Sequence, residues 1–151
     1  MPSRRVFEQQ LNSLQDSLVC LSEMVCQAVT DAVTALKSRD PDLARQIIVR
    51  DRELNQTRFE VDEACLAMLA TQQPAASDLR RIIAAMNVVL DLERMGDHAA
   101  NVAKTVIRIG DEPPLKPLID IPKMADQCCD MLRRSLAAYV VLDAEAAKAN
   151  R

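Results

Sequence analysis

The hydrophobic positions in the first hundred residues recur every three or four residues, which is the period of an α-helix packed along one face. The first such segment predicts a long helix over residues 4–37, with apolar positions at Leu11, Leu14, Leu18, Leu21, Val25, Ala28 and Ala32. A second helix is predicted over residues 42–72, with apolar positions seven apart at Ile47, Leu54, Val61 and Met68. Asp40 and Pro41 suit its start, as an N-cap and a proline in the first helical turn.

A third helix is predicted over residues 78–109, after Pro74 interrupts the pattern. Ser77 or Asp78 can cap its start, and Gly110 fits the position just after its last turn. Its apolar stripe comprises Ile82, Ala85, Val89, Leu92, Gly96, Ala99, Ala103 and Val106. Long helices joined by short connections run antiparallel, so the pattern predicts an all-α, up-down-up three-helix bundle.

Residues 111–122 contain four prolines and predict a stiff linker. A fourth helix is predicted over residues 123–142, and its apolar side comprises Met124, Cys128, Met131 or Leu132, Ser135, Tyr139 and Leu142. We expect this side to be covered by the first bundle or by another chain, because long apolar strips seldom face water.

The segment DAEAAKAN, which begins at Asp143, resembles DPDLARQI, which begins at Asp40. The similarity predicts a helix boundary at Asp143 and a second copy of the same helical unit. We therefore divide the chain into a first three-helix unit (1–110), a linker (111–122) and the beginning of a second, incomplete unit (123–151).

Composition narrows the class of protein. Hydrophobic residues make up 49% of the chain, but there are only two Phe, one Tyr and no Trp, so the core must be aliphatic. The net charge is −3 and no basic block is present, which argues against a nucleic-acid surface. The five cysteines form no CxxC motif, and we expect reduced, small core residues. No signal peptide or transmembrane run is evident, so we expect a cytoplasmic protein without membrane insertion.

Beside the apolar stripe of the third helix, Glu93, Asp97 and Asn101 are spaced four apart and form one row. The row is either a solvated face, with Arg94 spreading the charge, or a set of oxygen ligands for a hard cation. Asp62 and Glu63 of the second helix could approach it. Gly96 lies on the adjoining core face, and a mid-helix glycine indicates a close approach by a neighbour.

Three stretches, VDEACLAMLA, ATQQPAASDLRRI and DLERMGDHAANVAK, resemble the PhoU family of phosphate-uptake regulators. The resemblance extends from about Leu14 to Ile109. It implies a PhoU-like fold of two three-helix repeats, in which an E/DxxxD motif on the third helix carries metal. Glu93 and Asp97 occupy the motif positions, and Asn101 extends the row. The implied ion is Mg, Mn or Fe.

The resemblance also implies a function: negative regulation of phosphate uptake and phosphate signalling. The implied partners are the ATPase of the phosphate-specific ABC transporter, a phosphate-sensing histidine kinase and a second copy of the chain, as a homodimer. We expect no enzymatic activity, because no nucleophile stands beside a base. Two alternatives remain: a plain helical adaptor without metal, and a carboxylate metalloenzyme, although the Glu-x-x-His pairs of that class are absent.

Overall fold

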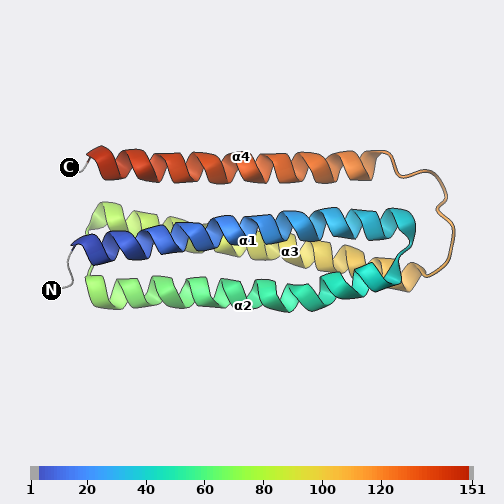
Figure 1. The fold of residues 1–151 in the computed structure, drawn as a ribbon, viewed down its shortest axis with the longest axis horizontal. Coiled ribbons are helices and arrows are strands. Elements are labelled where there is room, and N and C mark those ends of the chain that lie inside the picture. The colour runs from blue at the N-terminus through green and yellow to red at the C-terminus, as the bar shows by residue number, and fades with distance from the viewer. Residues whose placement is uncertain (1–3, 150–151) are drawn as a thin grey trace.

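Four long α-helices account for nearly all of the part of the chain that the computed structural model describes, residues 4–149, with side chains up to Val141 except Gln72. They are α1 (Arg4–Ser38), α2 (Pro41–Gln72), α3 (Ala76–Ile109) and α4 (Asp120–Ala149), and no strand occurs among these residues. Helices α1, α2 and α3 run up, down and up along one another (Figure 1), which confirms the predicted all-α three-helix bundle.

The predicted apolar stripes meet in the centre of this bundle. Every predicted stripe residue of α2 and α3 is buried, and so are all those of α1 except the half-buried Ala28. The largest fully buried side chains include Leu18, Leu21, Met68, Ile82 and Leu92. Burying each of them contributes about 1.5–3 kcal/mol relative to exposure, so burial of the three stripes drives the association of the helices.

Helix α1 has, within residues 4–149, the length and hydropathy of a membrane span. Its most apolar side chains, such as Leu18, Leu21 and Val25, are completely buried against α2 and α3. The core helix of a bundle has the same composition, so the hydropathy of α1 reflects its central place in the fold.

The start of α2 follows the sequence prediction. The Asp40 carboxylate accepts hydrogen bonds from the backbone N–H groups of Asp42 and Leu43, both at 3.1 Å, and Pro41 begins the helix. Such an N-cap stabilises a helix by about 1 kcal/mol. At the same end of the bundle, Gly110 follows α3 with a positive φ of 63°, and its N–H donates to the Val106 carbonyl at 3.2 Å. The predicted glycine terminator is thereby confirmed.

The predicted cap of α3 was wrong. The helix begins at Ala76, and the residue before it, Ala75, makes no side-chain cap. Asp78 is buried and forms ion pairs with Arg4 of α1 and, at 3.7 Å, with Arg81. Its carboxylate therefore joins the first turn of α1 to the first turn of α3, at the end of the bundle opposite Asp40 and Gly110.

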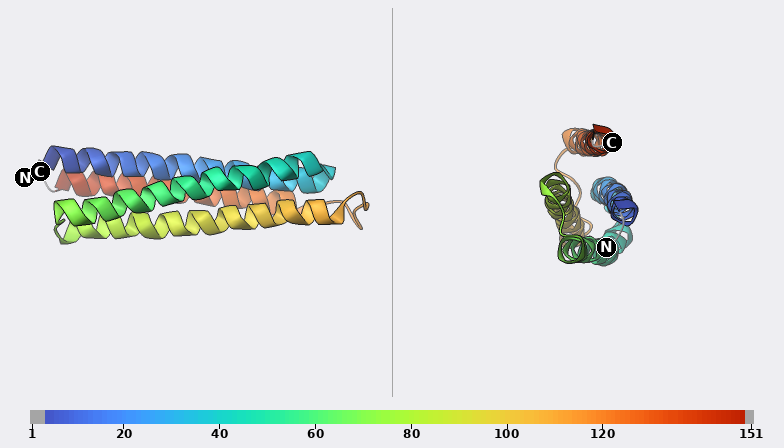
Figure 2. Two further views of the ribbon diagram at one scale, coloured as in Figure 1. Left: turned by 90° about the horizontal axis from the view of Figure 1, so that it is seen from below. Right: turned by 90° about the vertical axis from the view of Figure 1, so that its left-hand side faces the viewer.

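Helix α4 folds back antiparallel to α1 and packs on it (Figure 1), as one of the two predicted arrangements requires. The end-on view in Figure 2 places α4 outside the group formed by the other three helices. The predicted boundary at Asp143 was wrong, because the helix continues to Ala149. Asp143 precedes alanine where Asp40 precedes Pro41, and no residue from 143 to 149 is a glycine or proline that could end a helix.

The side of α4 that faces α1 differs in part from the predicted one. Cys129 and Leu136 are buried, with Leu132 and Tyr139 packed against the core. Met124 and Met131 belong to the predicted apolar side, yet they are 61% and 59% exposed. Helix α4 thus has two neighbouring apolar strips, and only one can face α1.

Candidate metal centre

The predicted row on α3 borders the seam between α2 and α3. Glu93 is half-buried, whereas Asp97 and Asn101 are exposed to solvent. Helical spacing keeps the three side chains one turn apart on one side of α3. The row is thus accessible to an ion from solution.

Gly96 brings α2 close to this row. A Cβ atom at position 96 would lie 3.2 Å from Cδ1 of Leu54 and 3.7 Å from Oδ1 of Asp51, both on α2. The first distance is shorter than ordinary van der Waals contact, so a Cβ here would require the Leu54 side chain to shift by a few tenths of an ångström. The close approach predicted at Gly96 is therefore present, and its neighbour is α2.

Asp51 is the acidic residue that this approach places beside the row, and sequence reasoning missed it. Burial raises the pKa of the Asp51 carboxyl, and the negative charge of Asp97 raises it further, while Lys104 and the Asn55 side chain act in the opposite direction. Asn55 Nδ2 donates to Asp51 Oδ2 at 3.5 Å. Asp51 and Asp97 thus form a pair of like charges across the seam, where a cation would be favoured.

Asp62 lies near the row, as predicted, but an arginine lies between its carboxylate and that of Glu93. Arg58 Nε lies 3.1 Å from Asp62 Oδ2 and 3.3 Å from Glu93 Oε2, so the guanidinium bridges the two carboxylates. Glu63 is exposed. Because Arg58 already neutralises Glu93, a metal ion could use Glu93 only if the arginine moved away. Arg94 pairs with Asp91 at 3.9 Å, on the exposed side of α3.

These positions define what the seam can bind. Within the described side chains, no group of three or more Asp, Glu, His or Cys residues is arranged as a complete metal site. Asp51 and Asp97 supply two carboxylates, and Asn55 and Asn101 supply amide oxygens nearby. This donor chemistry suits a hard, largely hydrated ion such as Mg²⁺ or Mn²⁺, which takes few protein ligands.

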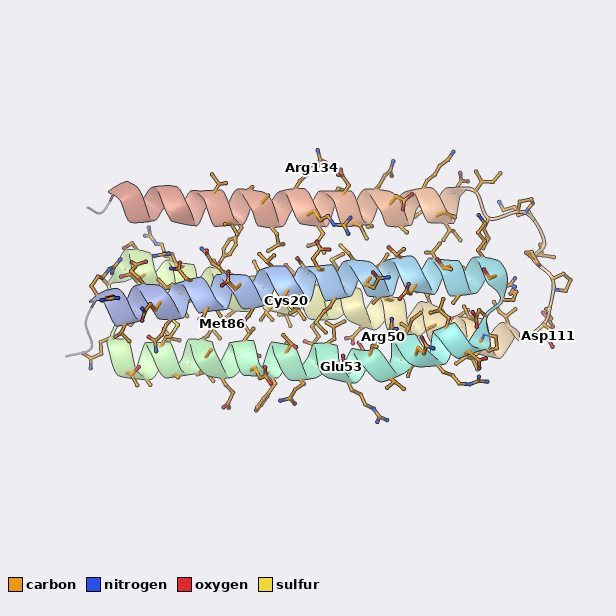
Figure 3. The ribbon with its side chains drawn as sticks, in the orientation of Figure 1. Cys20, Arg50, Glu53, Met86, Asp111 and Arg134 are labelled. Atoms are coloured by element: carbon orange, nitrogen blue, oxygen red, sulfur yellow. The ribbon has the colours of Figure 1, made fainter. Side chains whose placement is uncertain are left out.

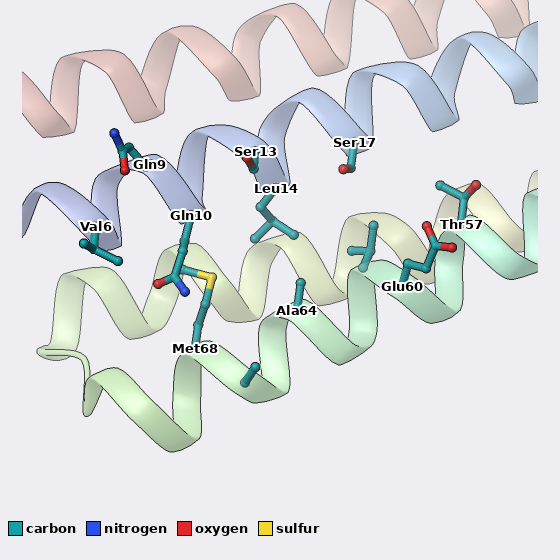
Figure 4. Close-up of a pocket in the computed structure, with 12 residues that line it drawn as sticks. Val6, Gln9, Gln10, Ser13, Leu14, Ser17, Thr57, Glu60, Ala64 and Met68 are labelled. Atoms are coloured by element: carbon teal, nitrogen blue, oxygen red, sulfur yellow. The ribbon is translucent and has the colours of Figure 1, made fainter. Parts of the chain in front are cut away.

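Other clefts offer less chemistry. The cleft between α1 and α2 in Figure 4 has a volume of about 350 Å³, and its polar lining is mostly hydroxyl and amide groups, with Glu60 as its one charged residue. A second cleft, about 270 Å³, lies beneath Gly96 and is bordered by Arg50 and Asp51. Arg50, labelled in Figure 3, pairs with Asp31 of α1 at 3.0 Å. The lining of the first cleft includes no arginine, lysine or histidine, and that of the second includes no hydroxyl group or thiol.

Comparisons with known proteins agree with this fold. The PhoU domain family matches residues 18–106. A phosphate-specific transport system accessory protein PhoU homolog from Pseudomonas putida is 38% identical over 144 residues, which cover 93% of this chain and 56% of the relative. The phosphate-specific transport system accessory protein PhoU of Escherichia coli is 30% identical, over 93% of this chain and 58% of its own length.

Two solved structures are similar to the chain as well. PhoU from Pseudomonas aeruginosa has a TM-score of 0.84 at 35% identity, over 95% of this chain and 69% of that one. The phosphate transport system regulatory protein PhoU from Streptococcus pneumoniae has a TM-score of 0.80 at 32% identity, over 89% of this chain and 63% of that one. These scores confirm the PhoU-like fold, and the chain spans a little over half the length of the curated relatives described above.

Proposed function

Because this chain belongs to the PhoU domain family, we propose that it is a regulatory accessory protein of phosphate transport that acts by protein contacts in the cytoplasm. The observation that carries the proposal is the match of residues 18–106, most of α1 to α3, to that family. Relatives that are 30–38% identical to this chain over the aligned residues are phosphate-specific transport system accessory proteins. The proposed partners are the ATPase of the phosphate-specific ABC transporter and a phosphate-sensing histidine kinase. The proposed effect of the chain is negative regulation of phosphate uptake and phosphate signalling.

A cellular test follows from this proposal. The chain is produced in a bacterium that lacks its own PhoU and carries a reporter controlled by a phosphate-starvation promoter. We expect the chain to restore repression of the reporter when phosphate is plentiful, and to leave the reporter active when phosphate is scarce. Full reporter activity at high phosphate, with the folded chain present in the cell, would contradict the proposal.

The proposed cofactor is a hydrated Mg²⁺, Mn²⁺ or iron ion at the α2–α3 seam. Asp51 and Asp97 are its proposed first ligands, and Asn101 supplies a carbonyl from the same row. Glu93 would join after losing the contact with Arg58, 3.3 Å away. The ion would supply positive charge, which neutralises the acidic pair and changes the electrostatic potential of the surface that partners meet. The second candidate is an adaptor that binds no metal. The observation that supports it is the contact of Arg58 with Asp62 and Glu93, because the arginine supplies the positive charge that an ion would otherwise supply.

We further propose that α4 begins a second helical unit related to the first. The two similar segments, at Asp40 and Asp143, are 103 positions apart. Cys26 of α1 and Cys129 of α4 have the same separation and make reciprocal contacts, which supports this proposal. At the same offset, Leu21 and Val25 of the α1 core face correspond to Met124 and Cys128, which are exposed on α4. The exposed strip would therefore pack against further helices, either from the same polypeptide or from a second copy in a homodimer.

A further inference from the structure

The contact between α1 and α4 is centred on two cysteines. Cys26 and Cys129 are 1% and 4% exposed, and both are reduced. The Cys26 thiol donates to the Cys129 carbonyl at 3.9 Å, and the Cys129 thiol donates to the Cys26 carbonyl at 3.7 Å. Because each sulfur reaches the backbone of the other residue, the two thiols lie next to each other in the contact between α1 and α4.

This cysteine pair occupies the seam that attaches α4 to the rest of the molecule. Helix α4 packs on α1, and beside the cysteines Arg133 of α4 pairs with Glu23 of α1 at 3.1 Å. That ion pair is more than half exposed on both sides, so solvent screens it and it contributes little to the attachment. A covalent bond at the cysteines would therefore change the attachment of α4 more than this ion pair does.

We propose that Cys26 and Cys129 are a disulfide-forming site, at which a two-electron thiol oxidant bonds α1 covalently to α4. With a peroxide, one thiolate attacks an oxygen and becomes a sulfenic acid as the O–O bond breaks and hydroxide leaves. The second thiolate then attacks the sulfenic sulfur, the S–S bond forms and a second hydroxide leaves. The two hydroxides take up the two thiol protons, so two thiols and one peroxide give one disulfide and two waters.

The environment of the pair keeps it reduced while α4 is docked. Burial, together with the neighbouring Cys129, raises the pKa of the Cys26 thiol to about 12, so very little reactive thiolate exists at neutral pH. Local opening of the α1–α4 seam exposes a sulfur to the oxidant, and closing brings the partner back to complete the bond. Oxidation is accordingly expected to be slow, and the product stable.

The proposal is tested with the full chain carrying Cys20→Ser and Cys128→Ser, since both of these cysteines are exposed. Cys26, Cys65 and Cys129 remain, and trypsin separates them into three peptides, residues 6–37, 59–80 and 124–133. The probe is diamide, whose N=N bond takes up two electrons and two protons from a thiol pair. The matched control adds Cys129→Ser, and circular dichroism verifies that both variants are helical.

In the test variant we expect diamide to remove two thiols and leave Cys65 free. Peptides 6–37 and 124–133 should be joined until a reductant is added. Oxidation should raise the melting temperature by about 5 °C or more, because the bond closes a long loop. The control should keep its melting temperature. If the folded test variant keeps all three thiols while the urea-unfolded chain is oxidised, or if the bond joins another pair, the proposal is overturned.

Discussion

Asp51 of α2 lies against Gly96 of α3, with its Oδ1 atom 3.7 Å from the place where a Cβ at position 96 would be. Cδ1 of Leu54 lies 3.2 Å from the same point, so the absence of a side chain at position 96 allows α2, which carries Asp51, to lie close to α3. The packing of α2 on α3 and the chemistry of the seam depend on the same position.

Replacing Gly96 with valine should destabilise the bundle. The new side chain would collide with Leu54, which is 97% buried from solvent. Overpacking of this kind costs about 1–3 kcal/mol, more than the helix propensity gained by removing a glycine. Urea denaturation of Gly96→Val measures the loss. The control is Ala137→Val at an exposed helical site, and equal stability of the two variants would show that Gly96 is not a packing constraint.

Asp78 should matter more for stability than an ordinary surface acid. Asp78→Asn removes the charge that pairs with Arg4 and Arg81 at a buried position, and we expect a loss of about 2–3 kcal/mol in the free energy of unfolding. The matched control is Asp130→Asn, because Asp130 pairs with Arg134 at 3.2 Å on an exposed surface. That change should cost less than about 0.5 kcal/mol. A loss at Asp78 as small as that of the control would contradict this prediction.

Divalent metal should stabilise the chain through Asp97. Binding to the folded state alone adds RT ln(1 + [L]/Kd), which corresponds to a rise of a few degrees in melting temperature at about ten times Kd. We expect millimolar Mn²⁺ to raise the melting temperature of the wild type. Asp97→Ala should lose most of that rise, and Glu93→Ala should lose less of it, because Arg58 already pairs with Glu93.

The same comparison without metal separates the two interpretations of the row. Removing Asp97 relieves its repulsion with Asp51, so the Asp97→Ala variant should be no less stable than the wild type in a chelator. If both proteins respond equally to Mn²⁺, the ion binds elsewhere and the row is a solvated face.

The exposed strip of α4 should govern assembly. Met131 is 59% exposed on this strip, so a chain of these 151 residues is expected to dimerise through it. Met131→Glu should convert the dimer to a monomer in light scattering, whereas Arg134→Glu, at a site on α4 already charged and exposed, should leave it dimeric. A monomeric wild type would refute the assembly.

The helices could be predicted because their signals are local. The spacing of residues such as Ile82 and Val89 identifies the buried face of α3 without reference to any other helix, and the Asp40 cap needs only its own next residues. The place of Asp51 could not be predicted in this way, because it depends on the register of α2 against α3. Gly96 signalled that a neighbour was close, but its spacing does not say which residue of which helix.

The two wrong predictions, the cap of α3 and the helix boundary at Asp143, also concern features that local sequence does not determine. Asp78 has the residue type and position of an N-cap, but ion pairs with Arg4 and Arg81 engage its carboxylate instead. The segment at Asp143 resembles the one at Asp40, but alanine follows Asp143 where Pro41 follows Asp40. Because this proline is missing, α4 continues through Asp143. A sequence pattern indicates which roles a side chain can take, and the tertiary contacts determine which of these roles it has in the fold.

The most direct test of the account is a binding measurement between this chain and the purified ATPase of the phosphate-specific ABC transporter, with and without Mn²⁺. We predict that the wild type binds the ATPase, that Mn²⁺ changes the affinity, and that Asp97→Asn removes the Mn²⁺ effect while the Arg134→Glu control keeps it. The absence of binding by the folded chain under both conditions would contradict the proposed regulatory role.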